Sequence, residues 1–177
     1  MKKKILLFLL FVIQLNVQAA VLTNQVNNPD YSVNVDKVGS KLRVTYAFDS
    51  VAIIPDPVFA GLFNLNIAGF GNSSEEAKPA LPILLERFAI PANCTYSVNV
   101  IEAQYSTYNN IKLAPARPAI SETSPYTFLT VPVEPIAISD RYEPFGVITD
   151  CGPQIFKKQQ IANIRVSPIA YNSALNS

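Results

Sequence analysis

Residues able to carry chemistry are few in this chain, and their types exclude most catalytic arrangements. The 177 residues include no histidine, so neither a Ser-His nor a Cys-His catalytic pair can form within the chain. The adjacent carboxylates Glu75 and Glu76 lie in a polar stretch that is typical of a solvated loop. The aspartates lack calcium-binding spacing, and the six glycines form no phosphate-binding loop. The sequence therefore predicts no catalytic residues, no metal site and no cofactor.

The two cysteines, Cys94 and Cys151, are the remaining reactive side chains. Without histidine they lack an activating base and the further ligands that a zinc site needs. In an oxidising compartment an even pair favours a disulfide between them. The alternative is two unpaired thiols, buried as small hydrophobic side chains.

The first 19 residues have the layout of a secretory signal peptide. Lysines at 2–4 precede an unbroken apolar run at 5–13, and Val17 and Ala19 are small residues suited to cleavage after Ala19. The alternative is a membrane anchor, but the apolar run is too short to span a bilayer. We expect residues 20–177 to be one exported domain without a membrane span, in a periplasmic, cell-surface or extracellular location.

Composition further narrows the classes of protein to which the chain can belong. The chain is 49% hydrophobic with a net charge of +1, which suits a globular core rather than disorder. Removal of the leader takes three lysines and no acids, so the exported domain is slightly acidic. Nucleic acid is therefore not an expected partner.

The elements that must position any functional residue are short strands. Apolar residues alternate with polar ones in several segments, which is typical of half-buried β-strands. These segments are residues 31–36, 41–48, 63–67, 96–100 and 161–166. The alternation slips once at Ala162-Asn163, which predicts a bulge there.

No segment keeps a helical period for three turns, since prolines interrupt the nearest candidate at 81–89. Prolines also crowd residues 114–144, which predicts an extended or loop-like surface stretch. The expected fold class is all-β: a single antiparallel β-sandwich or jelly-roll-like domain after the signal peptide.

An ordered set of motifs adds a family resemblance. Residues 78–84 read KPALPIL and precede FAIP at 88–91; YSVNV follows at 96–100, IKLAPARPAIS at 111–121 and VSPIAYN at 166–172. Taken in order, they resemble the N-terminal propeptide of gingipain-type cysteine peptidases. The resemblance is best over residues 78–124 and 161–172.

The resemblance implies a β-sandwich propeptide that helps a secreted zymogen to fold and blocks its active site until cleavage. The implied partner is a gingipain-like cysteine peptidase catalytic domain, in cis in a precursor or in trans. A loop of the propeptide would cross the active-site cleft and offer one side chain to the specificity pocket. The residues of this peptidase-docking loop would be Pro115, Arg117, Pro118, Ser121, Glu122 and Thr123.

The chain departs from the family pattern at two places that affect the expected function. Where arginine-specific members carry an arginine, this chain has Glu122, whereas Arg117 lies five residues earlier. Either the partner peptidase does not prefer a basic residue, or Arg117 or Thr123 makes the contact, or this copy no longer inhibits. Asn172 is followed by Ser173 instead of proline, and no catalytic domain follows, so a free-standing protein, a truncated product and a fragment all remain open.

A second functional hypothesis fits the same composition. Export, an all-β fold and low charge are equally typical of an adhesion or surface-structural β-sandwich module with no peptidase partner.

Overall fold

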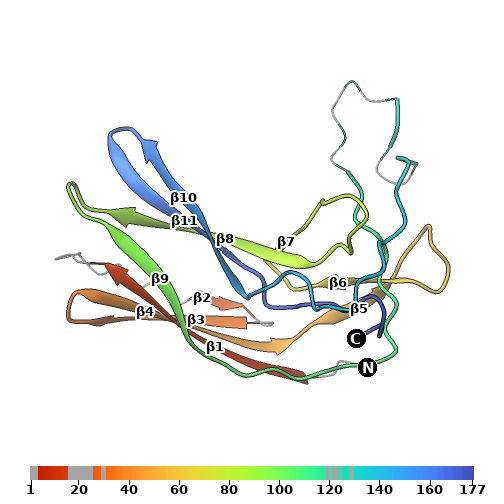
Figure 1. Cartoon of the computed structure of the whole chain (residues 1–177), viewed down its shortest axis with the longest axis horizontal. Coiled ribbons are helices and arrows are strands. Elements are labelled where there is room, and N and C mark those ends of the chain that lie inside the picture. Colours follow the sequence, from red (N-terminus) through yellow and green to blue (C-terminus); the bar gives the residue numbers. More distant parts are fainter. Residues whose placement is uncertain are drawn as a thin grey trace. The chain divides into compact units, whose positions relative to one another are not determined.

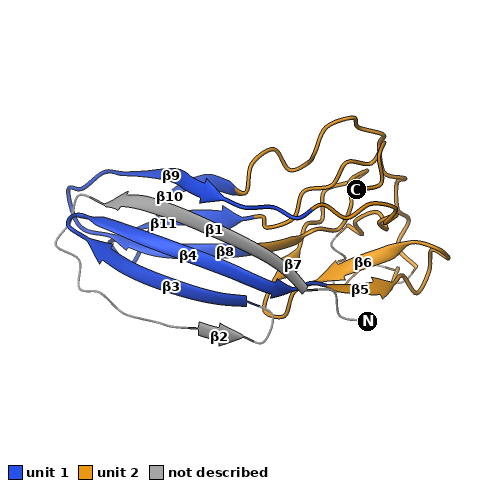
Figure 2. Ribbon diagram, turned by 90° about the horizontal axis from the view of Figure 1, so that it is seen from below, with its two compact units in different colours: residues 1–51, 84–106, 148–166 blue, residues 52–83, 107–147, 167–177 orange. Residues whose placement is uncertain are grey.

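The computed structural model describes residues 4–15, 26–28, 31–118, 120, 123, 125–127 and 130–177. The chain divides into two compact units, which Figure 2 shows in blue and orange. Unit 1 consists of Met1–Val51, Leu84–Ser106 and Ile148–Val166, and unit 2 of Ala52–Ile83, Thr107–Val147 and Ser167–Ser177. The chain therefore passes several times between the units, and neither corresponds to one continuous stretch of sequence.

Unit 1 is built from antiparallel sheets. A five-stranded sheet has the order β2-β3-β4-β1-β9, with the bounds β1 (Lys4–Leu15), β2 (Val26–Asn28), β3 (Tyr31–Val38), β4 (Lys41–Ser50) and β9 (Tyr96–Ala103). In the other sheet β11 pairs with both β10 and β8, with the bounds β8 (Pro82–Ile90), β10 (Ile148–Phe156) and β11 (Gln159–Val166). Figure 1 shows these strands as two layers of unit 1. The prediction of an antiparallel all-β fold is confirmed.

The core of unit 1 follows from the alternation in the sequence. Val44, Tyr46 and Phe48 of β4 have at most 2% of their surface exposed, while the residues between them are less buried. The ring of Phe48 stacks on those of Tyr31 and Tyr46, at 6.1 and 6.2 Å between centroids. The second sheet contributes a buried set of its own: Ile90, Ala162, Ile164 and Val166.

Polar contacts join the two sheets of unit 1. The Tyr46 hydroxyl of β4 donates a hydrogen bond to a carboxylate oxygen of Glu86 on β8, at 3.1 Å. Burial raises the pKa of Glu86, and this hydrogen bond only partly offsets the effect. The Tyr96 hydroxyl of β9 donates to Asp150 of β10 at 2.8 Å. Each contact spans the space between the layers, which confirms that the sheets face one another.

The predicted bulge in the last strand is wrong in its position. Residues 160–166 of β11 pair without interruption with β8. The register shift lies on the neighbouring strand β10, between Asp150 and Pro153. Gly152 there has a φ of +85°, and its carbonyl accepts a hydrogen bond from the buried Asn163 side chain of β11. A polar residue therefore tolerates a core position because the opposite strand bulges to meet it.

The predicted leader overlaps β1. The backbone of Lys4–Leu15 pairs antiparallel with β4 on one side and with β9 on the other. Cleavage after Ala19 stays a prediction, since a fold of the uncut chain does not test it. Among the described residues, no helix is long and apolar enough to cross a membrane.

Unit 2 contains short strands and long connecting segments. The hairpin β5 (Ala52–Pro55) and β6 (Phe63–Asn66) forms a two-stranded sheet, and β7 (Gly71–Asn72) pairs with the first residues of β8. Its buried side chains come from these elements and from the connections: Leu65, Ile67, Leu81, Leu113, Ala114, Ala116, Val147 and Tyr171. The proline-rich stretch forms no regular strand among its described residues, as the sequence predicted. The expectation that all of it lies on the surface is wrong at its start, because Ala114 and Ala116 are each 1% exposed.

Replacing Tyr46 with phenylalanine tests the contact between the sheets. Tyr46→Phe keeps the ring in the core but removes the hydroxyl donor from Glu86, so the free energy of unfolding should fall by about 1–2 kcal/mol. Urea denaturation measures the change. Adding Glu86→Gln to Tyr46→Phe should recover part of the loss, because the amide carries no charge to desolvate. An unchanged stability in Tyr46→Phe would show that the hydroxyl contributes nothing to the fold.

Candidate peptidase-docking site

The predicted docking loop belongs to unit 2 and begins at a buried, extended segment. The Phe63 amide of β6 donates to the Lys112 carbonyl at 2.9 Å, and the Ala114 amide donates to the Phe63 carbonyl at 2.8 Å. On the other side, the Ala116 amide donates to the Lys78 carbonyl at 2.7 Å. Pro115, a predicted site residue, lies in this segment and is buried. The segment is thus held along both edges before the exposed loop begins.

Arg117 is the next residue, and its side chain is engaged within unit 2. Its Nη2 atom donates to both carboxylate oxygens of Asp56, at 3.0 and 3.2 Å. The two side chains are 5% and 0% exposed. The guanidinium also lies over the Phe59 ring, 5.5 Å from its centroid, where the π-system favours a cation. A buried charge pair of this kind persists only when its hydrogen-bonding groups are satisfied.

Asp56 is satisfied by further donors. Its Oδ1 accepts from the amides of Val58 and Phe59, each at 2.8 Å, and its Oδ2 accepts from the Asn64 side chain at 2.8 Å. Burial alone would raise the pKa of Asp56. Hydrogen bonds from the Phe59 amide, Arg117, Asn64 and the Val58 amide outweigh burial and lower the pKa to about 2. Asp56 is therefore ionised at any physiological pH.

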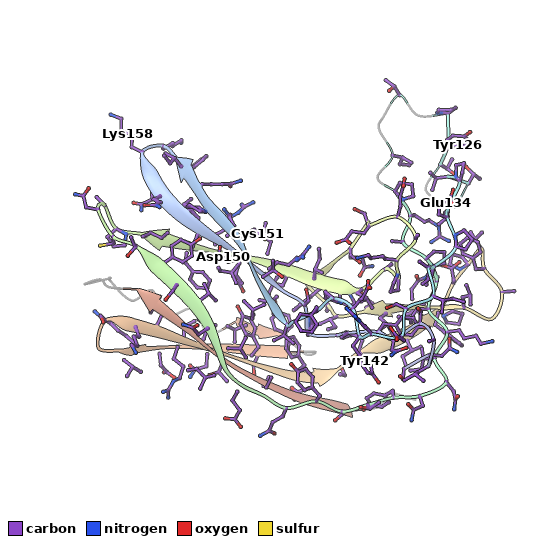
Figure 3. All side chains as sticks on the ribbon, viewed as in Figure 1. Tyr126, Glu134, Tyr142, Asp150, Cys151 and Lys158 are labelled. Carbon is purple, nitrogen blue, oxygen red and sulfur yellow. The ribbon has the colours of Figure 1, made fainter. Side chains whose placement is uncertain are left out.

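Beyond Arg117 the described residues of the loop turn to solvent. Pro118 is half-buried, while Ile120 is 38% and Tyr126 is 47% exposed. Figure 3 labels Tyr126 and Glu134 on the part of unit 2 that projects outward. The chain returns at Ala137, whose amide donates to the Ala77 carbonyl at 2.8 Å. The described residues between Pro118 and Ala137 are thus mostly exposed, and the chain is hydrogen-bonded within unit 2 on either side of them.

The remaining predicted site residues are placed as follows. Thr123 is exposed, whereas Ser121 and Glu122 lie outside the described residues. Cys94 and Cys151 are free thiols in the structure; Cys94 is half-buried, and Cys151 is exposed beside Asp150 on β10 (Figure 3). Their disulfide stays a prediction.

The late motif Tyr171-Asn172 is a structural anchor of unit 2. Tyr171 exchanges both backbone hydrogen bonds with Glu143, and its side chain is buried. The Asn172 side-chain nitrogen donates to the Asp140 carbonyl at 2.9 Å, and its side-chain oxygen accepts from the Leu175 backbone amide at 3.0 Å. This motif therefore fixes Asp140 and Glu143, just after the far end of the loop.

Sequence reasoning missed Asp56 and the bridging lysine Lys78. The Lys78 ammonium lies 3.1 Å from Glu75 and 3.2 Å from Glu143, although all three side chains are substantially exposed. Asp56 stands between Pro55 and Pro57, a pattern that marks a turn but not an ion pair. Its partner is 61 residues away, so no local signal identifies the contact.

Such an arrangement suits binding through a presented loop. Among the described residues, no three histidine, cysteine, aspartate or glutamate side chains group as metal ligands would. What unit 2 provides is an exposed loop with a buried, ion-paired start and a hydrogen-bonded end. The class of protein that this fold and site define is an all-β module that presents a surface loop.

Comparison with known proteins gives the family. The family model Propeptide_C25 matches residues 23–177, so the chain belongs to the propeptide family of the gingipain-type cysteine peptidases. A search of curated proteins gives no match.

Two solved structures share the fold. The complex of Porphyromonas gingivalis RgpB pro- and mature domains matches with a TM-score of 0.61 and 16% identity, covering 92% of this chain and 77% of that chain. The structure concerning zymogenic latency of gingipain K from the same organism matches with a TM-score of 0.61 and 18% identity, covering 93% and 89%.

Asp56 predicts a measurable acid sensitivity. Its folded pKa of about 2 lies below the ordinary 3.8, so the unfolded chain binds more protons between these values. The stability that Asp56 contributes is present above about pH 4 and is lost as the pH falls toward 2. The difference in unfolding free energy between the wild type and Asp56→Asn should shrink by about 2 kcal/mol across this window. Urea denaturation at several pH values measures it; a constant difference would contradict the assignment.

Proposed function

We propose that this chain is a non-catalytic propeptide that binds a gingipain-type cysteine peptidase catalytic domain, inhibits it and assists its folding. The observation that carries the proposal is the loop between Pro118 and Ala137, whose described residues are mostly exposed and which is held at both ends. Membership of the propeptide family supports it, as does the fold shared with a pro-domain seen in complex with its mature domain. Export by the predicted signal peptide would bring the chain to the compartment of such secreted enzymes.

The physical basis of inhibition is preorganisation. A segment that is ordered before it docks loses little conformational entropy on binding, so more of the contact energy appears as affinity. In this chain Pro115 and Pro118 restrict the backbone on either side of Arg117, and the Ala137 amide ties the other end. The loop can therefore reach a cleft while its two ends stay fixed on unit 2.

The chemistry of the loop favours a partner whose specificity pocket takes a non-basic residue. Between Pro118 and Asp140 the sequence has no lysine or arginine, and it has two acids, Glu122 and Glu134. An acidic pocket would find no cation there and would leave its own carboxylate unpaired, which is unfavourable. Glu122 and its neighbours Ser121 and Thr123 are the residues we assign to the contact.

Inhibition of a purified catalytic domain tests the proposal. The chain should reduce hydrolysis of a fluorogenic peptide by a gingipain-type peptidase, and Glu122→Ala should weaken this inhibition by roughly tenfold, the loss of one central contact. Titration of residual activity against inhibitor concentration gives the constants.

Glu76→Ala is the matched control, since it removes an exposed glutamate of unit 2 outside the loop and should leave the inhibition constant unchanged. If the wild-type chain inhibits none of a set of gingipain-type enzymes of different specificity, the propeptide function is lost. The surface-structural module would then be the better account.

A further inference from the structure

We propose that Arg117 and Asp56 are positioning residues of the docking loop, and that Arg117 does not itself enter the peptidase. Their ion pair fixes the point at which the loop leaves the buried part of unit 2. This inference rests on the proposed function for its effect on inhibition, although the pair's effect on the loop can be measured without any peptidase.

Burial is the first argument. The Arg117 side chain is 5% exposed, so its guanidinium has almost no surface to offer to a partner. It lies against the Phe59 ring on one side and donates to both oxygens of Asp56. A residue that fills a specificity pocket has to project from the surface, and the exposed part of the docking loop begins only after Arg117.

The consequence of moving Arg117 is the second argument. Swinging it out would break both hydrogen bonds and leave the Asp56 carboxylate, which has no exposed surface, without its counter-charge. The Val58 and Phe59 amides and the Asn64 side chain would still solvate the carboxylate, but they carry no compensating charge. A docking residue that has to disrupt the core of its own unit is a poor inhibitor.

The place of the pair along the chain is the third argument. Ala116, just before it, is 1% exposed and hydrogen-bonded to the Lys78 carbonyl; Ile120, just after it, is 38% exposed. Asp56 itself is tied to the β5–β6 hairpin, since its amide donates to the Leu62 carbonyl at 2.9 Å. The pair therefore clamps the start of the loop to that hairpin at the boundary between buried and exposed chain.

Asp56→Asn separates positioning from direct contact. If Arg117 positions the loop, Asp56→Asn loosens its start and should weaken inhibition by roughly tenfold, because ordering must then occur on docking. If Arg117 instead enters the peptidase, Asp56→Asn frees it, and inhibition should stay equal or become tighter. Arg117→Lys should resemble Asp56→Asn, since an ammonium neither forms the planar contact to Asp56 nor stacks on Phe59 as guanidinium does.

Glu75→Gln is the matched control. It makes the same acid-to-amide change in an ion-paired but exposed residue of unit 2, and inhibition should be unchanged. Thermal unfolding and circular dichroism check that each variant is folded at the assay temperature.

Hydrogen exchange followed by mass spectrometry gives a readout that needs no peptidase. Peptides covering residues 118–136 should exchange faster in Asp56→Asn than in the wild type, while peptides of β3 and β4 should not change.

If the wild type inhibits and Asp56→Asn inhibits equally well, the positioning role is wrong although the function stands. If the wild type inhibits nothing but exchange still accelerates, the function fails and the positioning role stands; unchanged exchange overturns the positioning role in either case.

Discussion

A carboxylate without exposed surface, Asp56, is the constraint on which the organisation of unit 2 depends. A buried charge is tolerated only where hydrogen bonds and a counter-charge replace water, and Asp56 takes these from three places in the chain. The amides of Val58 and Phe59 belong to the turn after β5. Asn64 connects β6 to Asp56, and Arg117 connects the segment that begins the loop to it. Because these donors come from three segments and meet at one carboxylate, the three segments are ordered together rather than one by one.

The strands could be predicted from the sequence where one face of the strand is buried and the other is exposed to solvent. Residues 31–36 and 41–48 alternate without interruption, because each lies in a sheet with a single core-facing side. β10 was not predicted because Cys151 and Gly152 form a bulge that breaks its alternation, and because most of its residues face solvent. The residues of the docking loop could be predicted because an ordered set of motifs resembles the family. The Asp56–Arg117 ion pair could not, because the two residues are far apart in sequence and no neighbouring residue of either indicates the contact.

The N-terminal segment supplies a central strand to the five-stranded sheet of unit 1. In the uncut chain β1 lies between β4 and β9 and pairs with both. Loss of residues 1–19 would leave the facing edges of β4 and β9 with unpaired amides and carbonyls, a state that favours new strand pairing. The family match begins at residue 23 and so includes both edges but not the strand between them. If the leader is cleaved as the sequence predicts, the remaining domain must satisfy these edges in another way, by direct pairing or by a strand from elsewhere.

Loop position and loop chemistry can vary independently in such a module. The buried pair and the Tyr171-Asn172 anchor fix where the loop begins and ends, and none of these residues contributes to the exposed surface between them in any large measure. If the loop docks as we propose, the residues in between can change with the specificity of the partner while the framework is kept. In this chain the stretch between the anchors carries acids, hydroxyls and apolar groups, and the arginine that precedes it, Arg117, is already paired with Asp56. A change of partner then requires substitutions only between the two anchors, since altering either anchor would disturb the core that holds the loop in place.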